Sequence, residues 1–238
     1  MKKILSFLFL MISFLISFAQ KSKKNLIEGS AFNIGLSYSN PARTEFDKYI
    51  AVISDSLNLT TSIIPRTTYG LFMAYTMRNG KSEFEAGGGL SFGTKAQSSD
   101  VSNSHSASLS TNTFDIHFGF SNYIAGPLFI GFDLGVISNG GKFEATENPE
   151  SLFESTPETH NPFKGYVFSV KPKAGFYFPF KPGTYSGFKL NVFYDYGLSK
   201  YEFYENDIFQ TRLKNYTGAA KSSFKGLGVQ AVLVFGGN

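Results

Sequence analysis

Eight segments of the chain alternate large apolar residues with small or polar ones, at the period of two that is typical of β-strands with two different faces. The pattern is clearest at 128–136, where Leu, Ile, Phe, Leu and Val are separated by Phe, Gly, Asp and Gly. Most segments equal or exceed the roughly 9–11 residues that a tilted strand needs to cross a bilayer. The predicted strands are 32–38, 67–78, 83–94, 114–121, 128–136, 163–178, 188–198 and 222–235.

The connections between these strands alternate between short and long. The short ones are 79–82, 124–127 and 181–186, and the Asn-Gly pair at 79–80 is a strong signal for a tight hairpin turn. The long ones are 40–66, 95–106, 138–162 and 199–221. This order places every tight turn at one end of an antiparallel sheet with an even number of strands. It predicts an all-β, eight-stranded antiparallel up-and-down transmembrane barrel, with short periplasmic turns and long extracellular loops.

The two faces of the predicted strands differ enough to indicate which one is outside. One face carries Phe, Leu, Ile and Tyr, whereas the other is mostly Gly, Ser, Ala and Asn with a few charges. A soluble eight-stranded barrel would need a charged outer face, so the small residues are predicted to crowd the lumen of a membrane barrel. Closure then follows, because hydrocarbon cannot satisfy backbone polar groups. The aromatic residues predicted at the membrane interfaces are Tyr38, Tyr69, Phe84, Phe92, Phe178, Phe188, Tyr196 and Phe235.

Leu134 and Gly135 show what this assignment implies for mutations, because they lie on opposite faces of one strand. Leu134→Arg should cost about 2–4 kcal/mol, since it places a charge near the bilayer midplane. Gly135→Ser should be mild unless the lumen is tightly filled.

Residues 1–19 have the features of a cleaved signal peptide. Lys2 and Lys3 precede an apolar stretch at 4–18, which is followed by a small residue, Ala19. The stretch is shorter than the roughly 20 residues of a spanning helix. We therefore predict a signal peptide at 1–19, a periplasmic tail at 20–30 and an outer-membrane barrel at 31–238. The absence of cysteine excludes disulfides and thiol chemistry. Without Lys2 and Lys3 the net charge falls from +4 to +2, a slight excess of basic residues.

From about Ala31 to Phe235 the pattern resembles the small eight-stranded outer-membrane barrels, a porin-like family that includes the membrane domain of outer membrane protein A. The resemblance rests on strand pattern and loop order, without a diagnostic motif. The end of the leader, Phe18-Ala19-Gln20, is similar to those of Bacteroidetes. The resemblance implies a location in the bacterial outer membrane, with lipid as the surrounding partner.

A few charged residues lie on the face that is predicted to line the lumen. We expect them to form a structural network, because buried charges persist only when they are paired and hydrogen-bonded. The alternative is a proton or ion path, but an eight-stranded barrel is just wide enough for side chains to fill it. The predicted network consists of Glu85, Asp115, His117, Asp133, Lys171, Lys173, Lys189 and Asp195.

Catalysis and metal binding are not predicted. Asp115, His117 and Ser121 share one strand face, but side chains along a strand point in parallel, whereas a catalytic triad needs convergent ones. His105 and His160 lie in different loops, without metal-ligand spacing. We therefore expect no enzyme activity, no cofactor and no metal.

One helix is expected, in loop 40–66. Asn40 can cap it and Pro41 suits its first position, and apolar residues then recur at spacings of three and four. These residues are Phe46, Tyr49, Ile50, Ile53 and Leu57. A strand extension is the alternative. Such a helix could cover the barrel mouth or offer its apolar stripe to a partner.

Two of the other long loops, 138–162 and 199–221, are candidates for contact with envelope proteins. Loop 138–162 is acidic and interrupted by prolines, which favours a solvated loop. Loop 199–221 mixes aromatic residues with both charge signs, and Glu202, Glu205 and Asp207 break any basic patch for nucleic acid. Together with loop 40–66, these loops indicate a non-enzymatic outer-membrane protein with a structural or surface-contact role. The alternatives are a narrow channel or passive transporter for small solutes, and an accessory of an envelope secretion or assembly system.

Overall fold

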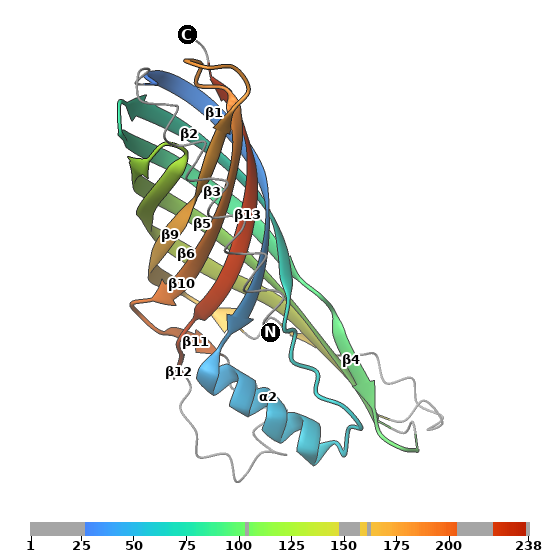
Figure 1. Ribbon diagram of the computed structural model, residues 1–238. Coiled ribbons are helices and arrows are strands. Elements are labelled where there is room, and N and C mark those ends of the chain that lie inside the picture. The colour runs from blue at the N-terminus through green and yellow to red at the C-terminus, as the bar shows by residue number, and fades with distance from the viewer. Residues whose placement is uncertain (1–26, 103–104, 148–157, 161–162, 204–220, 237–238) are drawn as a thin grey trace, which may run out of the picture.

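Eight antiparallel strands close into a barrel in the computed structural model, which describes residues 27–102, 105–147, 158–160, 163–203 and 221–236. Each strand pairs with the next one along the chain, and the last pairs with the first, Ala31 opposite Gly236 (Figure 1). This confirms the predicted up-and-down barrel. The ring is formed by β1 (Gly29–Ala42), β2 (Thr68–Asn79), β3 (Ser82–Gly93), β5 (His105–Ala125), β6 (Leu128–Glu147), β9 (Tyr166–Pro179), β10 (Gly187–Gly197) and β13 (Lys225–Gly236).

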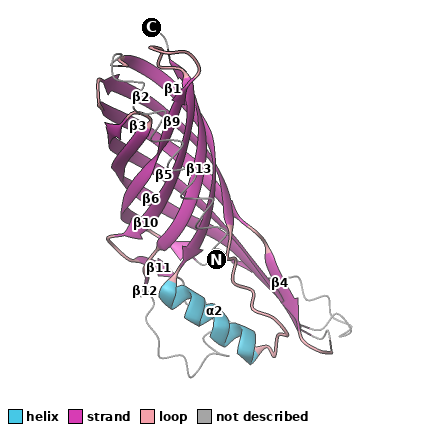
Figure 2. Cartoon of the chain, viewed as in Figure 1, coloured by secondary structure: helices cyan, strands magenta, loops and turns pink. Residues whose placement is uncertain are grey.

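The three short connections lie together at one end of the barrel, opposite the helix (Figure 2). Asn79 pairs with Ser82 around the turn at 80–81, and Gly126 with Pro127 joins β5 to β6. Gly80 and Gly126 have φ angles of 59° and 53°, which glycine adopts without the steric cost that a side chain would add. The predicted signal peptide lies outside the described residues, and β1 begins at Gly29, inside the predicted tail at 20–30.

The outer surface of the barrel is a belt of exposed apolar side chains. Leu36, Met73, Phe118, Leu134 and Leu227 are each at least half exposed, and they come from five different strands. Seven of the eight residues predicted at the membrane interfaces are exposed as well, and Phe188 is half-buried. Because the barrel is closed, the backbone groups of every barrel strand are hydrogen-bonded to a neighbour on both edges, and this belt can face hydrocarbon. The barrel therefore spans a membrane.

Segments of the predicted loops 95–106 and 138–162 are strands, and so are the described ends of loop 199–221. β5 and β6 continue beyond the barrel as one hairpin, in which His105 pairs with Glu147. β4 (Ala96–Ser99) adds to the β5 side and β7 (Glu158–His160) to the β6 side, so that a four-stranded arm projects from the barrel (Figure 1). The prediction of loops at 95–106 and 138–162 was wrong for these segments. These segments are rich in Ser, Thr and Gly and lack the apolar alternation of the membrane strands, because no lipid surrounds them.

Helix α2 (Thr44–Ser56) confirms the helix predicted in loop 40–66, but not its beginning. Asn40 and Pro41 belong to β1, where they pair with Leu227 and Gly226. The apolar stripe of α2 is buried against the barrel mouth, so it is not free for a partner. Among the described residues, no helix is long and apolar enough to cross a membrane. The stripe packs against Leu109, Ile137, Phe143, Phe163, Phe203 and Phe224.

The first turn of α2 is capped by a residue far away in the sequence. Arg43, at the cap position, makes no side-chain capping bond. Instead the fully buried hydroxyl of Ser222 accepts hydrogen bonds from the backbone N–H groups of Glu45 and Phe46, both at 3.2 Å. Ser222 belongs to β12 (Lys221–Ser222), which forms a small sheet at the mouth with β11 (Tyr201–Phe203) and β8 (Phe163–Lys164).

Ser222→Ala is therefore expected to loosen α2 at its first turn. Loss of a capping hydroxyl costs about 1 kcal/mol, or roughly fivefold in local opening. Hydrogen exchange of the amides of 44–57 should show faster exchange, while the barrel strands keep their protection. The matched control is Ser223→Ala, whose neighbouring hydroxyl caps nothing among the described residues. Equal exchange in the two variants would contradict capping from β12.

Candidate functional site in the barrel lumen

The eight charged residues named from the sequence all lie in the barrel strands. They occupy the strand positions whose neighbours on either side face lipid. Six of the eight side chains are buried, and Asp115 and Lys171 are half-buried. Five strands contribute them: Glu85 from β3, Asp115 and His117 from β5, Asp133 from β6, Lys171 and Lys173 from β9, and Lys189 and Asp195 from β10.

Lys173 lies at the centre of the network. Its Nζ is 2.8 Å from Oε1 of Glu85 and 2.6 Å from Oδ1 of Asp133, two carboxylates on different strands. Oε1 of Glu85 is also 3.6 Å from Nε2 of His117, and Nδ1 of His117 is 2.7 Å from Oδ2 of Asp115. One chain of charges therefore crosses the lumen from β6 through β9 and β3 to β5.

Lys171 extends this chain toward the mouth. Its Nζ is 3.4 Å from Oδ1 of Asp195 and 4.0 Å from Oδ2 of Asp115. The ammonium also lies over the ring of Phe193, 5.1 Å from its centroid. On the other side Phe72 stacks on His117, with the ring centroids 5.6 Å apart. The charges are thus interleaved with inward-facing aromatic rings that occupy the remaining space.

A second cluster near the short-turn end was not predicted, and Glu83 is its centre. Glu83 Oε2 accepts hydrogen bonds from the hydroxyls of Tyr123 (2.8 Å) and Tyr185 (2.7 Å). Its Oε1 is 2.5 Å from Nζ of Lys189. The guanidinium of Arg78 lies 3.5 Å from the centroid of the Tyr123 ring. Glu83 and Arg78 could have been found, since Glu83 shares the strand face of Glu85 and Arg78 the inward face of β2.

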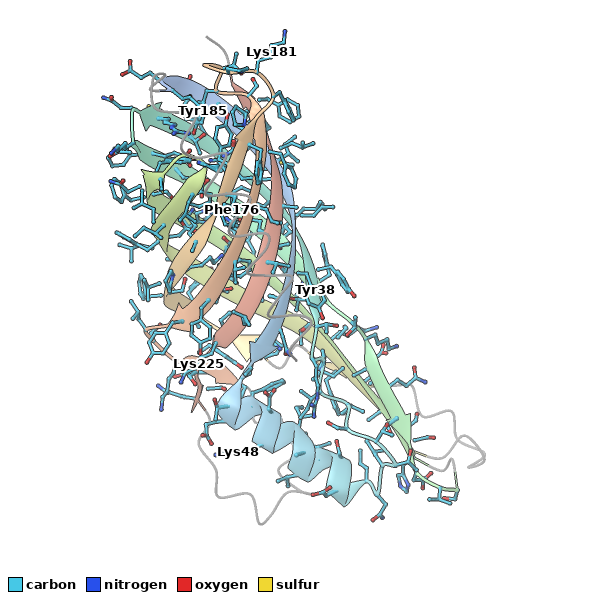
Figure 3. The ribbon with its side chains drawn as sticks, viewed as in Figure 1. Tyr38, Lys48, Phe176, Lys181, Tyr185 and Lys225 are labelled. Carbon is cyan, nitrogen blue, oxygen red and sulfur yellow. The ribbon has the colours of Figure 1, made fainter. Side chains whose placement is uncertain are left out.

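Both ends of the lumen are covered. At the short-turn end Tyr123, Tyr177 and Tyr185 are almost completely buried. The ring centroid of Tyr177 lies 6.1 Å from that of Tyr123 and 6.1 Å from that of Tyr185. Figure 3 shows Tyr185 and Lys181 at this end, and Lys48 and Lys225 at the other. At the mouth, α2 and its apolar partners cover the opening. A polar cavity of about 40 Å³ remains next to the network, lined by Asp115, His117, Asp133, Lys171 and Asp195 and by Arg43, the residue before α2.

Glycines set how tightly the strands and lumen side chains pack. A Cβ at Gly135 would lie 2.6 Å from the backbone oxygen of Ile116 and 2.9 Å from Cβ of His117. The backbone oxygen cannot give way without moving the strand. Gly135→Ser is therefore not the mild change that a loosely filled lumen would allow.

One grouping in the described part of the chain has the donor atoms for a metal ion. Glu85, His117 and Asp133 each offer one atom, and these atoms lie within 4.8 Å of one another. The ammonium of Lys173 already contacts two of the three. It therefore supplies positive charge where a cation would bind. Spacing along the sequence could not reveal this grouping, because each member comes from a different strand.

The Ser, His and Asp side chains of β5 do not form a triad. Asp115 and His117 do contact each other, which the parallel directions of strand side chains did not predict. Ser121, however, is buried and makes no hydrogen bond with His117. The base therefore has no nucleophile within this set.

No family model and no curated protein matches the sequence. Among solved structures, the chain is similar to the outer membrane protein Ail of Yersinia pestis, with 14% identity, a TM-score of 0.43, and 88% of this chain and 99% of that chain covered. For OprG of Pseudomonas aeruginosa the values are 11%, 0.38, 89% and 98%. For the outer membrane protease OmpT of Escherichia coli they are 8%, 0.39, 88% and 96%. These similarities concern the fold and do not extend to function.

The architecture itself gives the location. The barrel has an even number of antiparallel strands, short turns at one end and long extensions at the other, and an apolar outer belt. This combination is that of bacterial outer-membrane barrels. The chain is an outer-membrane β-barrel, with α2 and the arm on the extracellular side.

Proposed function

We propose that the protein is a non-catalytic, non-conducting barrel that acts through its extracellular surface. The filled lumen is the observation that carries this proposal. Charges paired across the barrel occupy its middle, tyrosines close the short-turn end, and α2 covers the mouth. An eight-stranded barrel has little room beyond its own side chains.

The lumen residues have a structural role in this proposal. Lys173, Lys171 and Lys189 each contact at least one carboxylate from a neighbouring or opposite strand. Two of these pairs, Lys173 with Glu85 and Lys189 with Glu83, tie together strands that share no backbone hydrogen bonds. A catalytic role has less support, because His117 is buried and no hydroxyl of the described residues hydrogen-bonds to it.

Purified protein in planar lipid bilayers should show no discrete ion currents. In the part of the chain that the structure describes, the charge network and both covered ends oppose a continuous water path. A general porin, measured in the same bilayers, controls for insertion. Regular current steps from this protein would contradict the sealed lumen and favour the narrow channel instead.

The extracellular surface is the part left to make contacts. The apolar stripe of α2 is buried, so the candidates are the arm and the outer face of the mouth. The arm includes segments of 95–106 and 138–162. We infer that contact is made there and through loops 40–66 and 199–221. On the arm, Lys95 and Lys142 both contact Glu144. Hydrogen bonds from these two lysines lower the pKa of Glu144 to about 2. Glu144 therefore stays ionised to lower pH than an unpaired glutamate would.

A photo-crosslinking residue at Val101 is expected to capture an envelope partner in intact cells. Val101 is 90% exposed and follows β4 in the arm. The control position is Lys181, which is exposed at the short-turn end (Figure 3). Adducts from Val101 and not from Lys181 would support surface contact. Adducts from Lys181 alone would place the partner in the periplasm and contradict the proposal.

A further inference from the structure

A lysine marks the extracellular border of the apolar belt on β13. The outward positions of this strand are apolar from Phe235 to Leu227, and the next outward position toward the mouth is Lys225. Lys225 pairs with Tyr196 of β10 on one side and with Ala42 of β1 on the other. Lys225 therefore lies on the outer face at the level where the barrel ends and α2 begins (Figure 3).

The Lys225 ammonium has an aromatic neighbour but no carboxylate partner in the described part of the chain. Its Nζ lies 5.4 Å from the centroid of the Tyr196 ring, which is the range of a cation–π contact. Lys200, three residues beyond the end of β10, is exposed and makes no ion pair within the described ranges either. By contrast, Lys221 at the mouth lies 2.8 Å from a carboxylate oxygen of Glu202. Two positive charges at the edge of the belt are thus left for anions from outside the chain.

The tyrosines of the outer surface also differ between the two sides of the membrane. Of the six exposed tyrosines among the described residues, five lie in the half of their strand that is nearer the mouth, and Tyr75 is the exception. At a membrane interface a tyrosine keeps its ring in the apolar region and its hydroxyl among the headgroups. The mouth side therefore suits a leaflet whose headgroups offer many hydrogen-bonding groups, as phosphorylated sugars do. The five tyrosines are Tyr38, Tyr69, Tyr166, Tyr194 and Tyr196.

We propose that the outer face of β10 and β13 binds the phosphate of a phosphorylated glycolipid in the outer leaflet. The Lys225 ammonium and the Tyr196 hydroxyl contact the phosphate, and Lys200 adds positive charge on the mouth side. The acyl chains of the lipid continue along the apolar belt over Leu227, which is 58% exposed. A free phosphate ion would lack this second contact. The lipid site is independent of any protein partner of the arm.

Native mass spectrometry of the folded protein measures this binding with defined lipids. The wild type should bind diphosphorylated lipid A at least about tenfold more tightly than lipid A without its phosphates, because each basic residue at a membrane surface strengthens anionic-lipid binding about fivefold. Lys225→Met should therefore weaken binding of the diphosphorylated lipid about fivefold, and Lys225→Met combined with Lys200→Met about twentyfold. Inorganic phosphate in excess should not displace the lipid.

Two matched variants control for loss of a lysine elsewhere. Lys221→Met removes the paired lysine at the mouth, and Lys181→Met removes an exposed lysine at the short-turn end. Both should bind the diphosphorylated lipid as the wild type does. Equal binding of the two forms of lipid A, or equal losses in Lys225→Met and Lys221→Met, would overturn the site.

The remaining outcomes identify other ligands and would also contradict a glycolipid site. Displacement by inorganic phosphate would make free phosphate the ligand, and equally tight binding of phosphatidylglycerol would show a general attraction for anionic lipids. Heat-modifiable gel mobility shows whether each variant is folded. Should Lys225→Met not fold, Lys225→Gln and the wild-type comparison of the two forms of lipid A decide.

Discussion

Lys173→Met is expected to lower the free energy of unfolding by about 3–5 kcal/mol, because removing one partner of a buried ion pair leaves an uncompensated charge. Here the loss is shared by Glu85 and Asp133, which both contact the Lys173 ammonium and are both buried. Methionine keeps most of the side-chain volume, so the change tests charge more than packing. Reversible urea unfolding in lipid vesicles measures the effect, with heat-modifiable gel mobility as the readout of the folded state.

Two further variants show whether pairing is the cause. Lys48→Met removes an exposed lysine that pairs with Glu45 at 3.2 Å on the outside of α2, and such a pair contributes at most about 1 kcal/mol. A triple variant adds Glu85→Gln and Asp133→Asn to Lys173→Met, which removes all three charges, and should recover much of the lost stability. A cost for Lys173→Met no larger than that of Lys48→Met would contradict the network.

The barrel and its two faces could be predicted because both depend on local alternation. Phe118 and Leu134 face lipid, and their sequence neighbours His117 and Asp133 face the lumen. Once one residue of a strand is assigned to a face, alternation therefore assigns the others. The alternation of long and short connections then predicts the number and order of the strands. Neither step needs a three-dimensional contact.

The pairing inside the lumen could not be predicted in the same way. Lys173 on β9 reaches Glu85 on β3, and these strands are not neighbours in the sheet. That meeting depends on how far the strands are staggered around the barrel, which no single strand sequence encodes. Tyr185 enters the lumen from a turn. Ser222 caps α2 at Glu45, which lies 177 residues earlier in the chain. Both contacts arise from closure of the barrel.

The outer ends of β5 and β6 were missed for a different reason. Segment 105–112 consists mainly of Ser, Ala, Thr and Leu, and it alternates only weakly. In the membrane, lipid selects strongly apolar residues on one face. Above it, the same strands pair with each other and with β4 and β7, and they pack against α2, so the sequence pattern that marks a membrane strand disappears.

Leu134→Arg is expected to cost about 2–4 kcal/mol, since a guanidinium near the bilayer midplane is poorly solvated. Leu134 lies on the outer face of β6, is 50% exposed, and pairs with Phe118 and Val170 on the adjacent strands. Unfolding in lipid vesicles by urea gives the free-energy difference. Vesicles with thinner bilayers should reduce it, because the arginine then reaches the headgroups more easily.

Val101→Arg is the control that distinguishes the cost of an arginine in lipid from its cost in water. Val101 is also apolar and is 90% exposed, but it lies in the extracellular arm. If exposure alone set the cost, Val101 would tolerate arginine no better than Leu134. Water solvates an arginine at 101, so this variant should stay within about 0.5 kcal/mol of the wild type, as surface substitutions generally do. Equal costs at the two positions would mean that the apolar belt does not face hydrocarbon, and that the barrel is not embedded as its surface indicates.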